Sequence, residues 1–510
     1  MSVTAATRTD FTLPRALSPS ELERVRGPLD IAFSDDVRDR VARCRAFLID
    51  RLVSGDQIYG ATTGFGPLIV FPGRRGGADQ CDNVLSHLSA GQGRDLAPGL
   101  IRAAMLVRLS SLARGRSGAS LDVMDSLGAA LGTTFAPAVP ELGSLGASGD
   151  LIPLAYVARA LCGEGHAYLD GRRLPAAEAL RIAGLRTLRL DGRDALALVN
   201  GTSLTTAAAA FALAHLHRAH STALTLSAVL IDLLGSAPRF LSPALLSAFG
   251  HPDTERAGAA LRERLAGTDS DPGRPLQEPY SVRCVPQLVG AVGTSLRHGH
   301  AVIQADLSSI SDNPLLFPET GEIAHGGNFF GQPAAFAADL LTTAAVQLGN
   351  LAERQLDLLI DPNRNGGINP MLSPAPGQQH GVQGVQLAAT AIVAQMRRAS
   401  TPASMQSLPT NLHNQDVVPF GTQAALNALC QAELLRILHG SLAVALRQAW
   451  HVGRRQPRAA ASEALLNRLA AEIEPIDPDR PLDGDVRRAA DILDDLTDDF
   501  ESITRSWVAP

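Results

Sequence analysis

Long and almost unbroken runs of alanine and leucine dominate the second half of the chain. They cover residues 201–235, 286–310, 332–360, 384–398 and 421–450. Alanine and leucine are strong helix formers, and most of these runs are longer than the usual globular helix. Apolar residues recur in them three and four positions apart, for example at Leu341, Ala344 and Leu348. This pattern predicts a central bundle of long helices that are buried on more than one side.

The first half of the chain carries shorter patterns. Helical periodicity begins at Ser20, runs from Asp36 to Leu52, and covers 98–115 and 120–131. Between these helical patterns, FPGRRGGADQ at 72–81 is typical of an exposed loop, because glycine and charged residues cluster there.

Strand signals are sparse. The clearest is HAYLDGRRL at 166–174, which predicts a hairpin with Asp170-Gly171 at its turn. We therefore expect a mostly α fold with three parts. These are a smaller N-terminal α+β part over 1–195, the long-helix bundle over 196–455 and peripheral C-terminal helices over 456–510.

Composition narrows the class of protein. The 510 residues are 45% hydrophobic and 19% charged, an ordinary globular balance, with a net charge of −6 that disfavours a nucleic-acid partner. The five cysteines are odd in number and form no CxxC pair, which favours free thiols in a reducing compartment over a zinc site. The N-terminus lacks the apolar core of a signal peptide, and polar residues interrupt the most apolar runs. We expect a cytoplasmic protein with no membrane span.

Five polar clusters interrupt the apolar helical sequence. Burying polar groups costs free energy unless they are paired or used, so such clusters are candidates for chemistry. They are IYGATTGFGPL (58–68), ASGD (147–150), ALVNGTS (197–203, with Asn200 opening the long helix), LQEPYSVRCVPQ (276–287) and LPTNLHNQDVVPFG (408–421), the last preceded by HGGNFFGQP (325–333).

The second cluster has an ordinary explanation when it is considered alone. Asp150 follows three small residues and precedes an apolar segment. It could therefore be the N-cap of a helix and accept that helix's first backbone N–H groups.

Together, the five clusters resemble those of the aromatic amino acid ammonia-lyases and aminomutases, over roughly residues 20–450. The resemblance implies the fumarase-like ammonia-lyase fold and a prosthetic group, 4-methylidene-imidazol-5-one (MIO), formed from Ala147-Ser148-Gly149. Glycine suits the sharp bend in which the Gly149 nitrogen attacks the Ala147 carbonyl carbon. Asp150 would assist the loss of water, cap the next helix, or do both. No metal and no external cofactor are implied.

The chemistry of the family explains why an electrophile is needed. The β-hydrogen of an α-amino acid is barely acidic, and its amine is a poor leaving group. In this family the amine adds to the electrophilic alkene, which makes the nitrogen a better leaving group, and a base removes the β-hydrogen.

The resemblance assigns further roles residue by residue. Tyr59 is the base, on a glycine-containing lid, and the site must lower the pKa of its phenol. Arg283 grips the substrate carboxylate, since its guanidinium matches that geometry. Each implied residue also has a purely structural alternative: Tyr59 could be a packed aromatic, Arg283 could form a structural ion pair, and the substrate-orienting residues could be core residues. The other implied residues are Tyr280 and Asn200 at the prosthetic group and reacting amine, Gln277, Asn328 and Gln415 orienting the substrate, and Phe329 lining the ring pocket.

The substrate follows from the segment around His87-Leu88. This pair resembles that of tyrosine ammonia-lyases, in which the imidazole binds the phenolic hydroxyl. Histidine-type enzymes also carry Ser-His here, but NFFGQP departs from their NFHAEP, and Gln415 stands where they have glutamate. His413 resembles the phenylalanine-type HNQD, and Gln383 lies at a pocket position that varies with substrate.

The predicted activity is the carbon–nitrogen lyase reaction that converts L-tyrosine to trans-p-coumarate. The alternatives are a tyrosine 2,3-aminomutase, a phenylalanine or histidine ammonia-lyase, and a helical scaffold without activity. The presence of Tyr59 and the intact tripeptide disfavours the scaffold. The resemblance also implies a homotetramer whose active sites combine residues from several chains.

Overall fold

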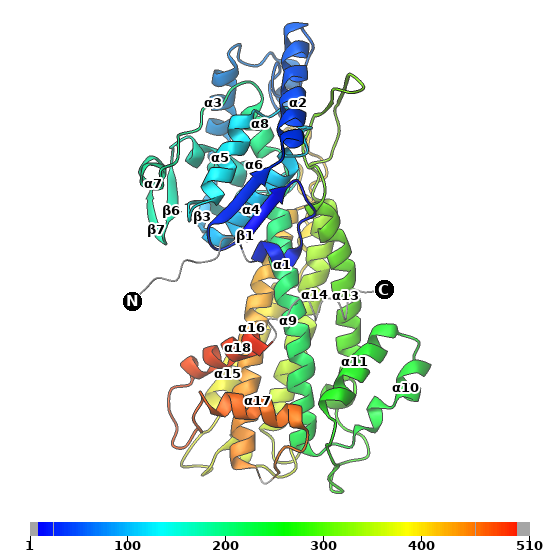
Figure 1. Cartoon of the computed structure of the whole chain (residues 1–510). Coiled ribbons are helices and arrows are strands. Elements are labelled where there is room, and N and C mark those ends of the chain that lie inside the picture. Colours follow the sequence, from blue (N-terminus) through cyan, green and yellow to red (C-terminus); the bar gives the residue numbers. More distant parts are fainter. Residues whose placement is uncertain (1–8, 24, 454, 497–510) are drawn as a thin grey trace. The chain divides into compact units, whose positions relative to one another are not determined.

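The computed structural model describes residues 9–23, 25–453 and 455–496, which are mostly helical (Figure 1). This confirms the predicted fold class. The chain divides into two compact units. The first unit lies within residues 1–211, 301–339 and 402–426, and the second lies within residues 212–300, 340–401 and 427–510. The domains expected from the sequence are contiguous, whereas each unit combines three segments that are distant along the chain.

The strands of the described residues all lie in the first unit, in four small sheets. Three sheets have two strands and one has three. In the two-stranded sheets, β1 (Thr9–Leu13) is parallel to β2 (Leu29–Phe33), β3 (Gln92–Asp95) is antiparallel to β5 (Pro140–Leu142), and β8 (Leu315–Phe317) is antiparallel to β9 (Glu322–Ala324). The three-stranded sheet consists of β4 (Ala136–Pro137), β6 (His166–Leu169) and β7 (Arg172–Pro175), with β6 in the middle and both pairings antiparallel.

The predicted hairpin is confirmed. Strands β6 and β7 pair antiparallel, and the two residues between them have positive φ, 50° at Asp170 and 76° at Gly171. A two-residue hairpin turn with φ above zero at both positions is of type I′, and Asp-Gly favours that turn.

Short and medium helices complete the first unit. They are α1 (Pro19–Glu23), α2 (Asp35–Val53), α3 (Gly77–His87), α4 (Pro98–Leu112), α5 (Leu121–Leu131), α6 (Leu151–Leu161), α7 (Ala176–Ile182) and α8 (Asp194–Val199). The predicted exposed loop over 72–81 is wrong in its second half, because α3 begins at Gly77. Cys81, Val84 and Leu85 are buried on one face of α3, and that burial stabilises a helix whose first residues read as a loop.

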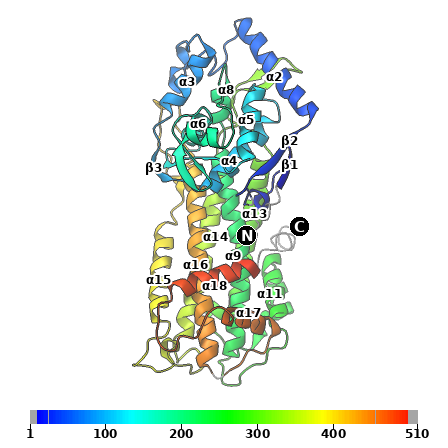
Figure 2. The ribbon, with the colours of Figure 1, turned by 60° about the vertical axis from the view of Figure 1, so that its left-hand side comes forward.

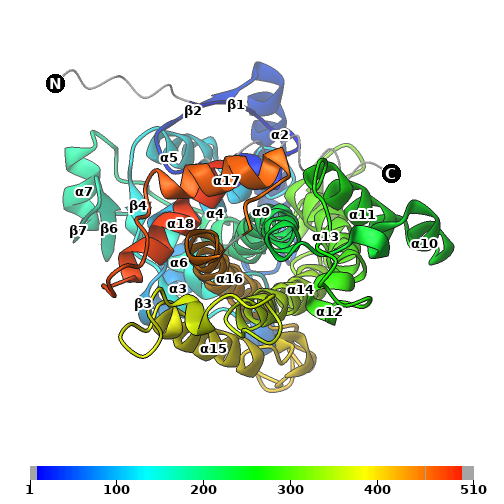
Figure 3. The same ribbon diagram turned by 90° about the horizontal axis from the view of Figure 1, so that it is seen from below.

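Long helices form the core of the second unit. Helices α9 (Ser203–Leu234), α13 (Val285–Leu307), α14 (Gln332–Leu359) and α16 (Gly421–Val452) lie side by side in all three views of the ribbon (Figures 1, 2 and 3). They match four of the predicted alanine and leucine runs to within a few residues. Around them are α10 (Pro243–Ala248), α11 (Pro252–Arg264), α12 (Tyr280–Arg283), α15 (Gln383–Arg398), α17 (Ala460–Ala470) and α18 (Asp483–Leu496).

Two helical stretches are long and apolar enough to cross a membrane by length and composition alone. They are Asp194–Leu234 and Gly421–Val452, with mean hydropathy 1.5 and 1.3. The most apolar window of the first is 100% buried inside the protein, and that of the second is 67% buried. Such burial is typical of the core helices of a globular protein, whose apolar surface faces other helices.

Candidate active site

Three helices of the first unit that pack against one another each place a predicted site residue at one end (Figure 2). His87 is the last residue of α3. Ser148 and Gly149 lie just before α6, and Asn200 is the C-cap of α8. Asn200 therefore ends a short helix, and the long helix α9 begins three residues later at Ser203. The packing of α3, α6 and α8 brings together residues that are distant in the sequence.

Three of these residues, His87, Ser148 and Asn200, line one cavity of about 610 Å³ in the first unit. Much of the lining is apolar and includes Phe65, Leu68, Leu151 and Leu196. A largely apolar pocket with a few convergent polar groups is the usual form of a small-molecule site. The predicted site residues in its lining are Tyr59, His87, Leu88, Ser148, Asn200, Phe329 and Gln415.

The tripeptide has the geometry that only glycine permits at its third position. Gly149 has φ of +71°, and a Cβ there would lie 2.5 Å from the Gly201 nitrogen. Its N–H donates to the Phe329 carbonyl at 2.9 Å. No larger residue fits this bend without moving the backbone of residue 201.

Two amide side chains hold Ser148 between them. Gln415 Nε2 donates to the Ser148 hydroxyl at 2.6 Å, and Asn200 Nδ2 donates to the Ser148 carbonyl oxygen at 2.8 Å. The Asn200 Oδ1 atom is buried and accepts no hydrogen bond from the described residues. The glycine-only bend, the two donors and this open acceptor fit the MIO group implied for Ala147-Ser148-Gly149.

Asp150 caps a helix, although not the one that the sequence predicts. It precedes α6, but its side chain makes no capping bond to α6. Its Oδ2 instead accepts the backbone N–H of Thr205 at 2.8 Å, in the first turn of α9. The carboxylate thus satisfies one of the free N–H groups at the start of the long helix, where negative charge is favourable.

Tyr59 belongs to a segment that folds back on itself. Its phenol oxygen accepts the backbone N–H of Gly66 at 3.0 Å, at the start of a short 3₁₀ helix over Gly66–Val70. Phe65 lies edge-on to the Tyr59 ring, with ring centroids 6.2 Å apart, and stacks on His87 with centroids 5.6 Å apart. Phe65 therefore contacts both the predicted base and the residue predicted to select the substrate.

The hydrogen bond of His87 determines what its other ring nitrogen can do. Nδ1 lies 2.8 Å from the backbone carbonyl oxygen of Asn83. Since a carbonyl only accepts, Nδ1 carries the proton, and in the neutral ring Nε2 is then an acceptor. His87 therefore offers the pocket a site that binds a hydrogen-bond donor.

The remaining predicted residues lie elsewhere. Gln277, Tyr280 and Arg283 line another cavity, of about 680 Å³, in the second unit. The Arg283 guanidinium lies 4.6 Å from the Tyr280 ring centroid, a cation–π contact. Its Nε is buried and has no hydrogen-bond partner among the described residues. Asn328 is exposed and lines neither cavity.

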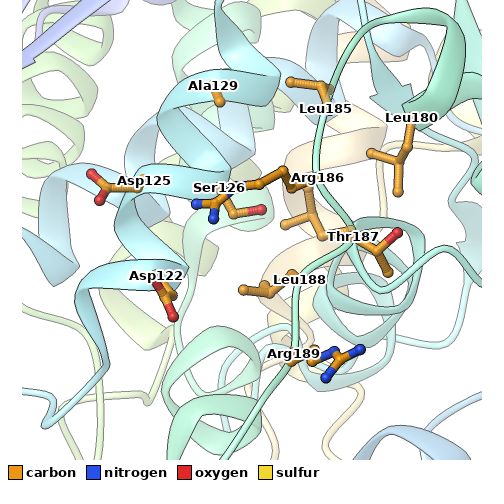
Figure 4. A pocket seen from close by; sticks show the side chains of 11 residues that line it. Asp122, Asp125, Ser126, Ala129, Leu180, Leu185, Arg186, Thr187, Leu188 and Arg189 are labelled. Atoms are coloured by element: carbon orange, nitrogen blue, oxygen red, sulfur yellow. The ribbon is translucent and has the colours of Figure 1, made fainter.

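A third cavity, of about 400 Å³, lies between α5 and residues 185–189 (Figure 4). Leucines form part of its lining, while Asp122, Asp125 and Arg186 supply charges of both signs. None of the predicted site residues lies there. No group of three or more His, Cys, Asp or Glu side chains among the described residues could hold a metal ion.

Several supporting residues escaped the sequence reasoning. Arg108 and Arg193 are fully buried and both pair with Asp312, at 3.3 and 2.9 Å. Arg108 also donates to the Ala197 carbonyl in α8, and so fixes the turn that carries Asn200. The sequence shows only isolated charges within apolar segments, and that unusual placement is the signal that could have found them.

Two further residues, His325 and Asn313, line the first cavity. His325 lines the first cavity, and its Nε2 accepts the Tyr59 backbone N–H at 3.5 Å. Burial lowers the pKa of His325, which favours the neutral ring that can accept this bond. Asn313 also lines the cavity and accepts the Gly326 N–H at 2.7 Å.

Known proteins similar to this chain share its length and its fold. The model of the family described as aromatic amino acid lyase matches residues 17–471. A histidine ammonia-lyase of Symbiobacterium thermophilum is 35% identical over 470 residues, which cover 91% of this chain and 92% of the relative. The solved structure of a tyrosine aminomutase from Streptomyces globisporus is 30% identical, with a TM-score of 0.89 and 99% of both chains covered. A phenylalanine aminomutase of Pantoea agglomerans is 27% identical, with a TM-score of 0.88, covering 94% of this chain and 98% of that chain.

Proposed function

Because the chain belongs to the aromatic amino acid lyase family, we propose that it eliminates ammonia from L-tyrosine and releases trans-p-coumarate. The observation that carries the proposal is one cavity lined by Tyr59, by Ser148 of the Ala-Ser-Gly tripeptide and by His87 with its acceptor nitrogen. Ala147-Ser148-Gly149 would supply MIO, an electrophile that makes the substrate nitrogen a better leaving group. The chain's own residues bind the substrate, orient it and move its protons.

Tyr59 is the base that takes the β-hydrogen. The Gly66 N–H donates a hydrogen bond to its phenol oxygen and so fixes the position of the atom that must take the proton. Asn200 Oδ1 is buried beside Ser148 and can accept a hydrogen bond from the substrate amine. Gln415 and Asn200 together hold the tripeptide where that amine must approach.

His87 favours tyrosine over phenylalanine. The phenolic hydroxyl of tyrosine is a donor, and Nε2 of His87 is the acceptor that matches it. Phenylalanine would leave this nitrogen without a partner, and a site built for a hydroxyl discriminates strongly against the analogue that lacks it. Phe65 and Phe329 line the same cavity and suit an aromatic ring.

Histidine as substrate is the first competing possibility, because curated relatives of this chain are histidine ammonia-lyases. The segment NFFGQP and Gln415 depart from the residues typical of histidine-type enzymes. A tyrosine 2,3-aminomutase is the second, because the tyrosine aminomutase structure matches 99% of this chain. A mutase would use the same residues and add ammonia back at the β-carbon.

The second cavity completes the substrate site in our proposal. Arg283 has a guanidinium suited to a carboxylate and a buried Nε without a partner, and Tyr280 is 71% exposed beside it. We propose a homotetramer in which the Arg283 cavity of one chain joins the Ser148 cavity of another. We also propose the cytoplasm as its compartment, in line with its five free cysteines.

A product assay tests the function. Purified protein is given tyrosine, phenylalanine and histidine separately, and the unsaturated acid is followed by near-ultraviolet absorbance with chromatography for β-amino acids. Coumarate as the main product supports the proposal. Cinnamate or urocanate would keep the reaction type and overturn the assignment of tyrosine, and β-tyrosine would indicate the mutase.

A further inference from the structure

Ser144 touches both ends of the tripeptide loop through one oxygen atom. Its hydroxyl oxygen accepts the backbone N–H of Gly146, the residue before the tripeptide, at 3.2 Å. The same hydroxyl lies 2.8 Å from Oδ1 of Asp150, the residue after the tripeptide. A single buried side chain therefore spans the turn that contains Ala147, Ser148 and Gly149.

Two more hydroxyls meet at the same carboxylate oxygen. Thr205 Oγ1 lies 2.7 Å from Asp150 Oδ1, and Thr422 Oγ1 lies 2.8 Å from it. The hydroxyls also contact one another, with Thr422 Oγ1 2.9 Å from Thr205 Oγ1 and 2.7 Å from Ser144 Oγ. Asp150 is fully buried, and its Oδ1 atom has only these neutral hydroxyls as hydrogen-bond partners among the described residues, while Oδ2 accepts the Thr205 backbone N–H.

The backbone of the loop is tied down as well. The Asp150 N–H donates to the Gly201 carbonyl at 2.7 Å, and the Gly146 carbonyl accepts the Gly331 N–H at 3.0 Å. Gln423 Nε2 donates to the Ser144 carbonyl at 2.7 Å. The two ends are therefore held by separate parts of the first unit, and the hydroxyls join one end to the other.

Ring formation within the tripeptide needs that restraint. The Gly149 nitrogen bonds to the Ala147 carbonyl carbon, and the Ala147 oxygen leaves as water with the amide protons of Ser148 and Gly149. The Ser148 hydroxyl then leaves with the Ser148 Cα proton as a second water. The first bond forms only when two backbone atoms are held closer than an ordinary turn keeps them, so fixed loop ends accelerate it.

We propose that the hydroxyls of Ser144, Thr205 and Thr422 form a clasp around Asp150, and that this clasp sets the rate at which the tripeptide closes into its ring. The proposal rests on the MIO group of the proposed function. The three residues are positioning residues: they act through Asp150 and the loop ends, and they touch no substrate. Their effect is on formation of the group rather than on turnover.

The test follows the mass of the tripeptide after synthesis. Wild-type protein and variants are made in a cell-free system, and the peptide containing residues 147–149 is weighed at intervals for the loss of two waters. Thr205→Val with Thr422→Val removes two hydroxyls at nearly constant shape. A hydrogen bond to a charged group is worth enough that the rate should fall by roughly tenfold to 100-fold. The single variant Thr205→Ser keeps a hydroxyl at this position and should mature at close to the wild-type rate.

Two comparisons separate this effect from general damage. Thr206→Val changes the next residue of α9, which is also buried but is not among the hydrogen-bond partners of the Asp150 side chain, and it should mature normally. Activity divided by the matured fraction should stay near the wild-type value in the threonine variants. A double variant that is folded by circular dichroism and matures as fast as wild type overturns the clasp.

Ser144→Ala decides the matter if the threonine double variant does not fold, because Ser144 lies outside the helices. Normal maturation of Ser144→Ala would then overturn the proposal, and slowed maturation would support it. Wild-type protein that never loses two waters would instead overturn the prosthetic group of the proposed function.

Discussion

The phenol oxygen of Tyr59 accepts a hydrogen bond from the backbone N–H of Gly66, seven residues further along the same segment, at 3.0 Å. The side chain proposed as the base is therefore held by the backbone of the loop that carries it. Phe65 lies between this pair and His87, edge-on to one ring and stacked on the other. A movement of this segment would displace the proposed base and would also withdraw the ring that stacks on His87.

Tyr59→Phe should abolish most turnover without preventing ring formation. The change removes the proton acceptor but leaves the aromatic contact with Phe65, and the contribution of a general base is typically about 10²–10⁴-fold. The measurement is kcat on tyrosine together with the mass of the tripeptide. Tyr156→Phe is the control, since Tyr156 lies outside the cavity and its hydroxyl donates only a long bond of 3.4 Å to Gly91. Full activity of Tyr59→Phe would rule out its role as the base.

Gly149→Ala should prevent loss of the two waters. The new Cβ would lie 2.5 Å from the Gly201 nitrogen, and φ of +71° is strained for any residue with a side chain. Gly165→Ala is a matched control, because Gly165 also has φ of +71° but no atom within 4 Å of a built Cβ. We expect the control to mature normally despite its backbone strain. Intact mass distinguishes the two, and an equally matured Gly149→Ala variant would contradict the packing argument.

His87→Phe should shift preference from tyrosine toward phenylalanine. The substitution removes the acceptor nitrogen and leaves an aromatic ring against Phe65. The ratio of kcat/KM for the two substrates is the measurement, and a loss of roughly 1–3 kcal/mol of discrimination is expected when the substrate hydroxyl loses its hydrogen-bond partner. His87→Gln retains an acceptor oxygen and should keep more of the tyrosine preference. An unchanged ratio in His87→Phe would show that this residue does not read the hydroxyl.

Co-expression of two inactive variants should restore activity if the cavities of different chains combine. Tyr59→Phe damages the first cavity and Arg283→Ala damages the second. In a mixed oligomer, some sites then receive an intact first cavity from one chain and an intact second cavity from another. Tyr59→Phe with Ser148→Ala is the control, because both residues line the same cavity. Equal activities of the two mixtures would exclude sharing of these cavities between chains.

Acid should destabilise the fold through buried histidines. Burial lowers the pKa of His217 and His439 to about 3 and that of His220 to about 4, below the ordinary 6.5. Below pH 6.5 the unfolded chain therefore binds protons that the folded chain does not, and stability falls as the pH falls. The linkage is about 2 kcal/mol for His439 between pH 7 and pH 5.

Denaturant midpoints at several pH values measure this effect. His439→Leu should flatten the dependence on pH, whereas the same change at the exposed His251 should leave it as in wild type. A wild-type protein whose midpoint does not change between pH 7 and pH 5 would contradict the burial of these rings.

The sequence predicts the helices of the bundle well because the residues at which these helices begin and end are determined by the local sequence. Helix α16 is expected over 421–450 and spans Gly421–Val452, since alanine and leucine dominate the run and no proline interrupts it. Helix α3 was missed because glycines at its start dominate the local pattern. The burial of Cys81 and Val84, which stabilises α3, depends on tertiary packing.

Contacts across the fold could not be read from local patterns. Asp150 looks like a cap for the helix that follows it, yet its partners Thr205 and Thr422 lie 55 and 272 positions away. Asn200 likewise looks like the start of a helix and instead donates to Ser148, 52 positions before it. The resemblance to a known family names residues that line one cavity, but it does not supply these bonds.

The position of Thr422 in the sequence determines when the network around Asp150 can be completed during synthesis. It is residue 422 of 510, and its hydroxyl belongs to the network around Asp150. Because the chain is synthesised from its N-terminus, Ser144, Asp150 and Thr205 are made long before Thr422 and its hydroxyl. Chains cut short before residue 422 consequently lack the complete network, so the surroundings of the tripeptide are finished only after residue 422 has been added.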